Sequence, residues 1–211
     1  LCYRSEEATV PFVNAVISEL RRGCITDFEL VLVANYHKGI PDATPDVVRK
    51  LAKTNSKIVP VIHEKKGMMG WDVIKGLSAA TGEAVALIDG DGQMPPNDIV
   101  RLYKVLESGE FDFVKTYRTK RYDGIQRLII SRIYNTIFKL LFPGFPYRDI
   151  NSKPKLWNRT SLLQLDLRCT GWFSDGEMML EARRLDFSFA EIPTVFSENE
   201  WRGSFVNKKL F

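Results

Sequence analysis

The chain alternates short apolar runs with longer stretches in which apolar residues recur at helical spacing. The short runs are rich in aliphatic residues and end at polar or glycine-containing turns, which is typical of strands. They predict strands near residues 28–34, 58–62, 85–88, 111–117, 156–157 and 187–195. The helical spacing predicts helices over about residues 10–20, 44–51, 71–80, 97–106, 125–142 and 175–184. This alternation predicts an α/β fold with a doubly wound, mostly parallel mixed sheet flanked by helices.

The composition is that of one globular domain over residues 1–211. Of its 211 residues, 45% are hydrophobic and 27% are charged, enough for a full core. The chain opens at Leu1 without a methionine, so we expect a trimmed first strand. Its three cysteines are isolated, which argues against a disulfide framework or a zinc site and favours a reducing compartment.

The net charge of +4 is mild, but basic residues cluster in one region. Such a cluster suits an anionic lipid surface or phosphate groups, and we expect no nucleic-acid partner. No apolar run approaches the ~18 residues of a membrane span. The clustered residues are Arg118, Lys120, Arg121, Arg127, Arg132 and Lys139.

Two acids, Asp89 and Asp91, directly follow the third predicted strand. Ligands bind at the carboxyl ends of strands in open α/β sheets, where these acids would offer hard oxygen atoms to a divalent cation. Gly90 would leave room for a phosphate or a sugar to approach the backbone. A plain turn is the alternative, because Asp and Gly favour turns. An EF-hand loop is excluded, because Met94 and Val100 stand where its glycine and its bidentate acid belong.

The predicted helix at about residues 125–142 is unusually apolar for a surface helix, yet it carries arginine and lysine residues. Two interpretations remain open. The helix packs into the core, or it lies on a membrane surface with its apolar side in the lipid.

Several short motifs are spread over the chain. Tyr3-Arg4-Ser5-Glu6-Glu7 opens it, Asp89-Gly90-Asp91-Gly92-Gln93-Met94-Pro95-Pro96 follows the third strand, and Arg202-Gly203-Ser204 lies near the end. Arg118, Arg127, Ser131 and Asp149 lie between the last two. Together they resemble the family-2 inverting glycosyltransferases, in the branch of dolichyl-phosphate mannose synthases and polyprenyl-phosphate glycosyltransferases. The family's Asp-x-Asp-x-Gln-x-x-Pro segment is the most specific of these similarities.

The resemblance implies a nucleotide-diphospho-sugar transferase (GT-A-like) fold and a role for each matching residue. It implies Mg²⁺ or Mn²⁺ on Asp91 and Gln93, with Asp89 near the nucleotide ribose or the same metal. The donor, a nucleotide-diphosphate sugar, is expected at Tyr3, Glu7, Asn35, Asp89, Gly90 and Asp91. The acceptor phosphate is expected at Arg118, Arg127, Ser131 and Arg202. At the end of the second strand, Ala34-Asn35 replaces the family's usual Asp pair. The resemblance therefore does not identify the base of the nucleotide.

The expected chemistry is sugar transfer to a polyprenyl phosphate at the cytoplasmic face of a membrane, to which the protein binds peripherally. Asp91 and Arg118 are the expected catalytic residues, because leaving and attacking phosphates both need cations. A carbohydrate hydroxyl acceptor would need a base, for which Asp149 and Glu177 are candidates, although both could instead pair with arginines. A sugar-nucleotide-binding module without turnover is the alternative outside enzymes.

Overall fold

The computed structural model describes residues 1–122 and 124–198. Arg202 therefore lies outside the described residues, and its predicted role in acceptor binding stays a prediction. Helices are η1 (Glu6–Ala8), α1 (Thr9–Arg22), α2 (Thr44–Thr54), α3 (Met69–Ala79), α4 (Asn97–Leu106), α5 (Ile125–Leu141), α6 (Arg159–Leu162) and α7 (Ser174–Arg184). Strands are β1 (Leu30–Val33), β2 (Ile58–Val61), β3 (Ala84–Leu87), β4 (Phe113–Arg121), β5 (Lys155–Asn158) and β6 (Phe189–Phe196).

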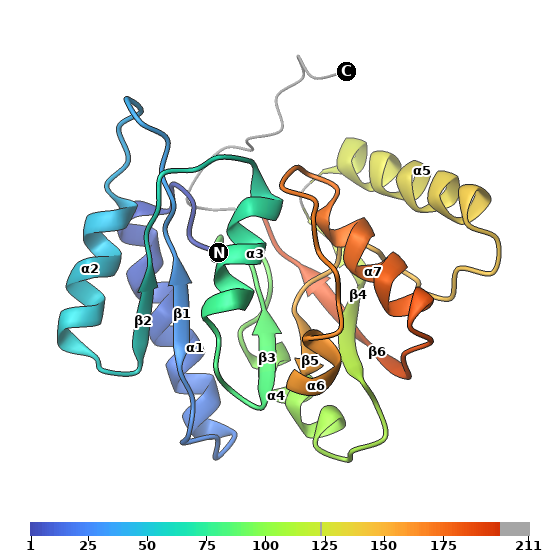
Figure 1. Cartoon of the computed structure of the whole chain (residues 1–211), viewed down its shortest axis with the longest axis horizontal. Coiled ribbons are helices and arrows are strands. Elements are labelled where there is room, and N and C mark those ends of the chain that lie inside the picture. The colour runs from blue at the N-terminus through green and yellow to red at the C-terminus, as the bar shows by residue number, and fades with distance from the viewer. Residues whose placement is uncertain (123, 199–211) are drawn as a thin grey trace.

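The strands form two sheets that lie side by side (Figure 1). Strands β1 and β2 pair in parallel, and the second sheet has the order β3-β5-β4-β6. Strand β5 runs antiparallel to both of its neighbours, whereas β4 and β6 are parallel. The predicted α/β fold with mixed strand directions is thus confirmed, although the described strands form two sheets with as many antiparallel as parallel pairs.

The first two residues connect the two sheets. The amino group of Leu1 donates to the carbonyl of Ile88 at 2.9 Å, and the N–H of Gly90 donates to the Leu1 carbonyl at 2.8 Å. On the other side, the N–H of Cys2 donates to the Val33 carbonyl at 2.8 Å. The chain start therefore runs directly beside the Asp-x-Asp turn.

Aromatic side chains fill the core where β4 meets β5. The rings of Phe113 and Trp157 stack with centroids 4.2 Å apart, and both side chains are fully buried. Tyr147 packs edge-on against Phe113 at 5.7 Å and against Phe145 at 4.9 Å. This packing fixes the segment that precedes β5 and, with it, the polar residues that the segment carries.

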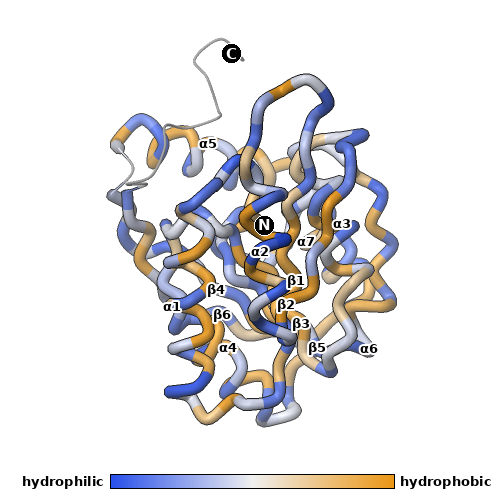
Figure 2. Tube along the Cα trace, turned by 90° about the vertical axis from the view of Figure 1, so that its left-hand side faces the viewer, coloured by the Kyte–Doolittle hydropathy of each residue, from blue (hydrophilic) through white to orange (hydrophobic). Residues whose placement is uncertain are grey.

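Helix α5 lies on the outside of the molecule, on the side remote from β1 and β2 (Figure 1). Phe138 is its only buried residue. Hydrophobic and hydrophilic positions alternate along the helix in Figure 2. The core-packing interpretation is therefore wrong for most of the helix. Its exposed apolar residues are Ile125, Ile129, Ile130, Ile133, Ile137, Leu140 and Leu141.

Candidate active site

The Asp-x-Asp turn begins where β3 ends. The Asp91 Oδ1 accepts the N–H of Gln93 at 3.1 Å, and Gly92 has a φ of 72°, a left-handed conformation that favours glycine. The Gln93 side chain is buried, and its amide donates to the Ser197 carbonyl at 3.0 Å. Gln93 therefore ties the turn to the segment after β6, and its role as a metal ligand stays a prediction.

The turn fits a divalent ion that is bound mainly through substrate. No cluster of three His, Cys, Asp or Glu side chains able to hold a metal occurs within residues 1–122 and 124–198. Mg²⁺ is commonly bound by one or two carboxylates together with substrate phosphates and waters, and Asp91 offers such a carboxylate at a partly exposed position. The residues present would therefore suit a divalent ion whose remaining ligands come from the donor diphosphate.

The predicted purpose of Gly90 needs correction. A Cβ at this position would lie 2.8 Å from the Leu1 carbonyl oxygen and 3.3 Å from the Cys2 Sγ. Glycine is required here because the start of the chain packs against the turn, rather than to admit a phosphate or a sugar. Gly90 is itself buried.

Asp89 forms an ion pair that sequence reasoning did not find. The Lys153 Nζ lies 3.1 Å from the Asp89 Oδ2 and also 3.1 Å from the Asp175 Oδ2. Asp175, from the first turn of α7, pairs with Lys155 as well. The Asp89 side chain is 31% exposed, whereas those of the other three residues are buried. One acid of the turn is thus paired with a buried ammonium group.

Burial and charge act in opposite directions on these lysines. Burial lowers the pKa of Lys153, but its two carboxylate partners outweigh that effect and raise it. Burial, together with the nearby charges of Lys153 and Lys115, lowers the pKa of Lys155 to about 8. Asp175 acts in the opposite direction but does not offset this. Burial raises the pKa of Asp175, but the two adjacent lysines more than offset this and lower it. Lys153 is therefore the charged partner that Asp89 and Asp175 share.

Asn35, the predicted contact to the base, lies at the end of β1 with only 1% of its surface exposed. Its amide donates to the Asp72 Oδ1 at 2.8 Å, and its carbonyl accepts the N–H of His63 at 2.8 Å. Asp72, from α3, also pairs with Lys65. A carboxylate is thus present beside β1 after all, supplied by α3. Any effect of Asn35 on the donor would pass through these partners.

The other predicted donor residues lie near the same strand ends. The Lys65 Nζ lies 4.2 Å from the centroid of the Tyr3 ring, whose edge meets the His37 ring at 6.0 Å. Tyr3 thus belongs to the group around Asp72. Glu7 is exposed in η1, and its role in donor binding stays a prediction.

Two of the residues predicted for the acceptor phosphate, Arg118 and Ser131, lie together with Asp149, a candidate base. The Arg118 Nε and Nη2 donate to the two Asp149 carboxylate oxygens, each at 2.7 Å, and the Ser131 Oγ lies 3.5 Å from Nη2. A register shift in the β4–β6 pairing follows Arg118 directly, and such bulges re-aim side chains. The guanidinium also lies over the Phe196 ring, 5.4 Å from its centroid.

Asp149 has the properties of an anchor for Arg118. Burial raises its pKa, but the hydrogen bonds and charge of Arg118, together with Lys115, outweigh that effect and hold the pKa at about 2. A carboxylate with such a low pKa is a poor general base near neutral pH.

Two residues that the sequence did not single out support this arrangement. The buried Lys115 Nζ donates to the Asp149 carbonyl and pairs with Glu191 at 3.0 Å. Asn135, on α5, donates to the Ser131 carbonyl at 2.8 Å and accepts the N–H of Ile150 at 3.1 Å. A lysine inside the apolar run 111–117 is the signal that could have revealed Lys115.

Arg127 lies one helical turn before Ser131 on α5 and is half-buried. Glu177, the other candidate base, accepts the N–H groups of Arg168 and Cys169 at 2.9 Å each. It therefore holds the loop before α7, and a catalytic role for it has no support in these contacts.

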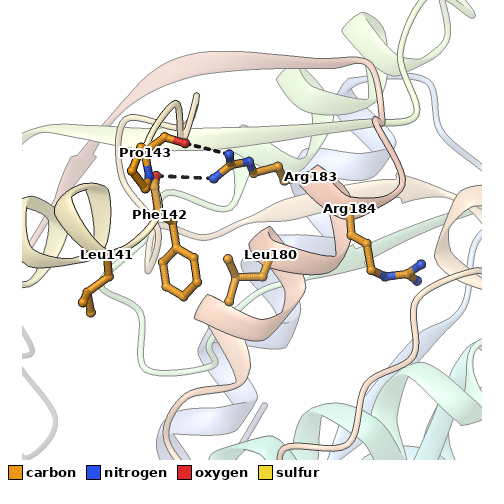
Figure 3. A pocket seen from close by; sticks show the side chains of 6 residues that line it. All are labelled: Leu141, Phe142, Pro143, Leu180, Arg183 and Arg184. Carbon is orange, nitrogen blue, oxygen red and sulfur yellow. Dashed lines mark hydrogen bonds between the residues drawn. The ribbon is translucent and has the colours of Figure 1, made fainter.

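A hollow of about 370 Å³ lies away from these residues, between the end of α5 and α7 (Figure 3). The Arg183 guanidinium donates to the Pro143 carbonyl at 2.6 Å and to the Phe142 carbonyl at 3.3 Å. Arg184 points away from Phe142 and pairs with Glu181 at 2.8 Å. None of the predicted site residues lines this hollow, so we assign no phosphate to it. It is lined by Leu141, Phe142, Pro143, Leu180, Arg183 and Arg184.

A mixed α/β sheet with an Asp-x-Asp turn at a strand end is the architecture of a nucleotide-diphospho-sugar transferase, and comparisons with known proteins agree. The chain belongs to Glycosyl transferase family 2, whose model matches residues 1–163. It is therefore a glycosyltransferase domain.

Individual relatives are distant. The chain is 33% identical over 109 residues to an undecaprenyl-phosphate 4-deoxy-4-formamido-L-arabinose transferase of Pseudomonas syringae, covering 51% of this chain and 31% of the relative. An Aeromonas hydrophila protein of the same name is 29% identical over 135 residues, covering 62% and 39%. The chain thus spans about a third of the length of these curated relatives.

Solved structures share the fold. Glucosyl-3-phosphoglycerate synthase from Mycobacterium tuberculosis, in complex with Mn²⁺, UDP-glucose and phosphoglyceric acid, matches with a TM-score of 0.66 and 21% identity. The match covers 97% of this chain and 71% of that protein. The predicted GT-A-like fold is confirmed.

Proposed function

We propose that this domain transfers a sugar from a nucleotide diphosphate to a polyprenyl phosphate at a membrane surface. The observation that carries the proposal is the position of Arg118. Its guanidinium is oriented by Asp149 and lies beside Ser131 on α5, a helix whose exposed surface is largely apolar. A phosphate with an apolar tail matches both features.

The donor side is proposed to use Mg²⁺ or Mn²⁺ on Asp91. A bound ion would neutralise charge on the leaving diphosphate, as the fold relative crystallised with Mn²⁺ and UDP-glucose suggests. Through this ion Asp91 would orient the diphosphate, and Tyr3 with the group around Asp72 would bind the nucleoside. An acceptor phosphate oxygen would bond to the anomeric carbon as the bond from that carbon to the diphosphate oxygen breaks, with inversion.

The available bases favour an anionic acceptor. A carbohydrate hydroxyl must lose a proton on attack, whereas a phosphate monoester, with a second pKa near ~6, is already anionic at neutral pH. Asp149 is paired with Arg118 with a pKa of about 2, and Glu177 is bound to backbone N–H groups. The names of the two curated relatives, both undecaprenyl-phosphate transferases, point the same way.

The site of action is proposed to be the cytoplasmic face of a membrane, with peripheral attachment through α5. Ile133, Ile137 and Leu140 are 53%, 50% and 75% exposed on this helix. Arg132 and Lys139 are exposed next to them in the sequence and would meet anionic headgroups. Within the described residues, no helix has the length and apolarity to cross a bilayer.

The test is a transfer assay with a panel of uridine- and guanosine-diphosphate sugars, Mn²⁺ and either undecaprenyl phosphate or oligosaccharides. The proposal expects a glycosylated lipid phosphate whose formation stops when EDTA removes the metal. Transfer only to oligosaccharide hydroxyls would refute the lipid acceptor. Binding of a nucleotide sugar without transfer to any acceptor would instead identify a sugar-nucleotide-binding module.

A further inference from the structure

Three lysines are buried in or next to the second sheet, beneath the candidate site. Lys115, Lys153 and Lys155 are each at most 2% exposed. An isolated buried ammonium group is costly, so each needs a carboxylate or carbonyl partner. Lys115 pairs with Glu191 and donates to a backbone carbonyl, and Lys155 pairs with Asp175. Lys153 differs, because one of its two partners is an acid of the Asp-x-Asp turn.

Lys153 connects the surface of the site to its interior. Asp89 is the partly exposed partner, and Asp175 is the buried one, with 31% and 4% of their side chains exposed. The Lys153 Nζ lies 3.1 Å from a carboxylate oxygen of each acid, so the two acids share the ammonium group equally. Lys155 pairs with Asp175, and within residues 1–122 and 124–198 no hydrogen bond or ion pair joins it to Asp89. A change at Asp175 therefore alters how strongly Lys153 attracts Asp89.

We propose that Lys153 is a positioning residue that limits how tightly the Asp-x-Asp turn binds a divalent ion. The inference rests on the proposed metal-dependent function but not on the lipid acceptor. Lys153 holds one Asp89 oxygen and places a positive charge beside the turn. A divalent ion on Asp91 is repelled by this charge and competes with it for Asp89. The donor diphosphate must then supply much of the attraction.

This arrangement makes opposite predictions for two substitutions. Lys153→Met removes the competing cation, so Mn²⁺ alone should bind more tightly. Asp175→Asn removes the buried acid that shares Lys153, so Asp89 should be held more strongly and Mn²⁺ alone should bind more weakly. A role in folding alone would not produce opposite signs.

The experiment is a titration of the whole chain with Mn²⁺ in the absence of nucleotide, with free Mn²⁺ measured by EPR. Lys153→Met should lower the Kd for Mn²⁺ by about tenfold, equivalent to about 1.4 kcal/mol. Lys153→Arg keeps the charge and should restore wild-type binding. Lys155→Met is the matched control, because it removes a buried lysine from Asp175 without touching Asp89. Its effect should stay below about threefold, because its charge lies farther from the turn.

Equal Mn²⁺ affinity in the wild type, Lys153→Met and Asp175→Asn would overturn the inference, as would equal tightening by Lys155→Met. If Lys153→Met did not fold, weaker binding by Asp175→Asn would still support it and unchanged binding would refute it. If neither the wild type nor any variant bound Mn²⁺ alone, this inference would fall. The metal of the proposed function would be refuted only if Mn²⁺ also failed to bind in the presence of the nucleotide diphosphate. If the predicted changes in Mn²⁺ affinity were observed but no lipid phosphate was glycosylated, only the lipid acceptor would be refuted.

Discussion

Asp149→Asn is the substitution that most directly tests the acceptor side. It keeps the shape of the side chain but removes the charge that faces Arg118. The pair is nearly dry, with 11% of the Asp149 side chain and 7% of the Arg118 side chain exposed. Asparagine would retain one acceptor oxygen, so the variant should fold while holding the guanidinium less firmly.

The magnitude follows from the pKa of Asp149. Burial raises it, but Arg118 and Lys115 outweigh that and lower it from 3.8 to about 2. At about 1.4 kcal/mol per pKa unit, the pairing stabilises the folded state by about 2 kcal/mol. Because the folded pKa is depressed, this stability is present above pH about 4 and is lost as the pH falls through about 2.

The assay compares urea unfolding of the wild type and Asp149→Asn from neutral pH down to pH about 2. The free energy of unfolding of the variant should be lower by about 2 kcal/mol at neutral pH, and the difference should disappear at the acid end. Asp46→Asn is the control, because its pair with Arg49 is exposed and its loss should leave stability unchanged.

The same variant tests function. With its guanidinium less firmly held, Arg118 should bind the acceptor phosphate less well, and KM for polyprenyl phosphate should rise about tenfold, equivalent to about 1.4 kcal/mol. Affinity for the nucleotide sugar should stay the same. Wild-type stability at neutral pH together with wild-type KM would refute the anchoring role of Asp149.

Further substitutions separate the donor, the acceptor and the membrane. Asp91→Asn should abolish metal-dependent transfer with an unchanged circular dichroism spectrum, and near wild-type turnover with Mg²⁺ would show that the metal lies elsewhere. Arg127→Ala should raise KM for polyprenyl phosphate or lower turnover, and calorimetry should find nucleotide-sugar binding intact; loss of that binding would move Arg127 to the donor side. The wild type should float with anionic vesicles, less so at high salt, and changing Ile133 and Ile137 to serine should weaken partition by at least about tenfold without lowering stability, since both side chains are exposed. Unchanged flotation would argue against α5 as the attachment.

The sequence predicts the elements better than their pairing. Each predicted strand and helix exists, because apolar periodicity is a local signal. The helices η1 and α6, with three and four residues, are too short to show a period. The place of β5 between β3 and β4 was not predictable either, since it depends on contacts between residues 84–87 and 155–158.

The candidate site shows the same division. The resemblance pointed to Arg118, Ser131 and Asp149, and these do meet in the structure. The partner of Asp89 was missed, because Lys153 is 64 positions away and nothing local connects them. The exposed state of α5 was also open in the sequence, since an apolar helix can face either a core or a lipid surface.

Most of what the sequence could not predict about the candidate site is which charged residues pair there. Asp89 pairs with Lys153, Asp149 with Arg118, and Asp72 with Lys65. In each pair the basic partner neutralises an acid near the sheet edge, so the protein alone offers a cation less negative charge than its acids suggest. The two phosphates of a donor would supply the remainder. Metal affinity in such a site is set by the basic residues behind the acids as much as by the acids themselves.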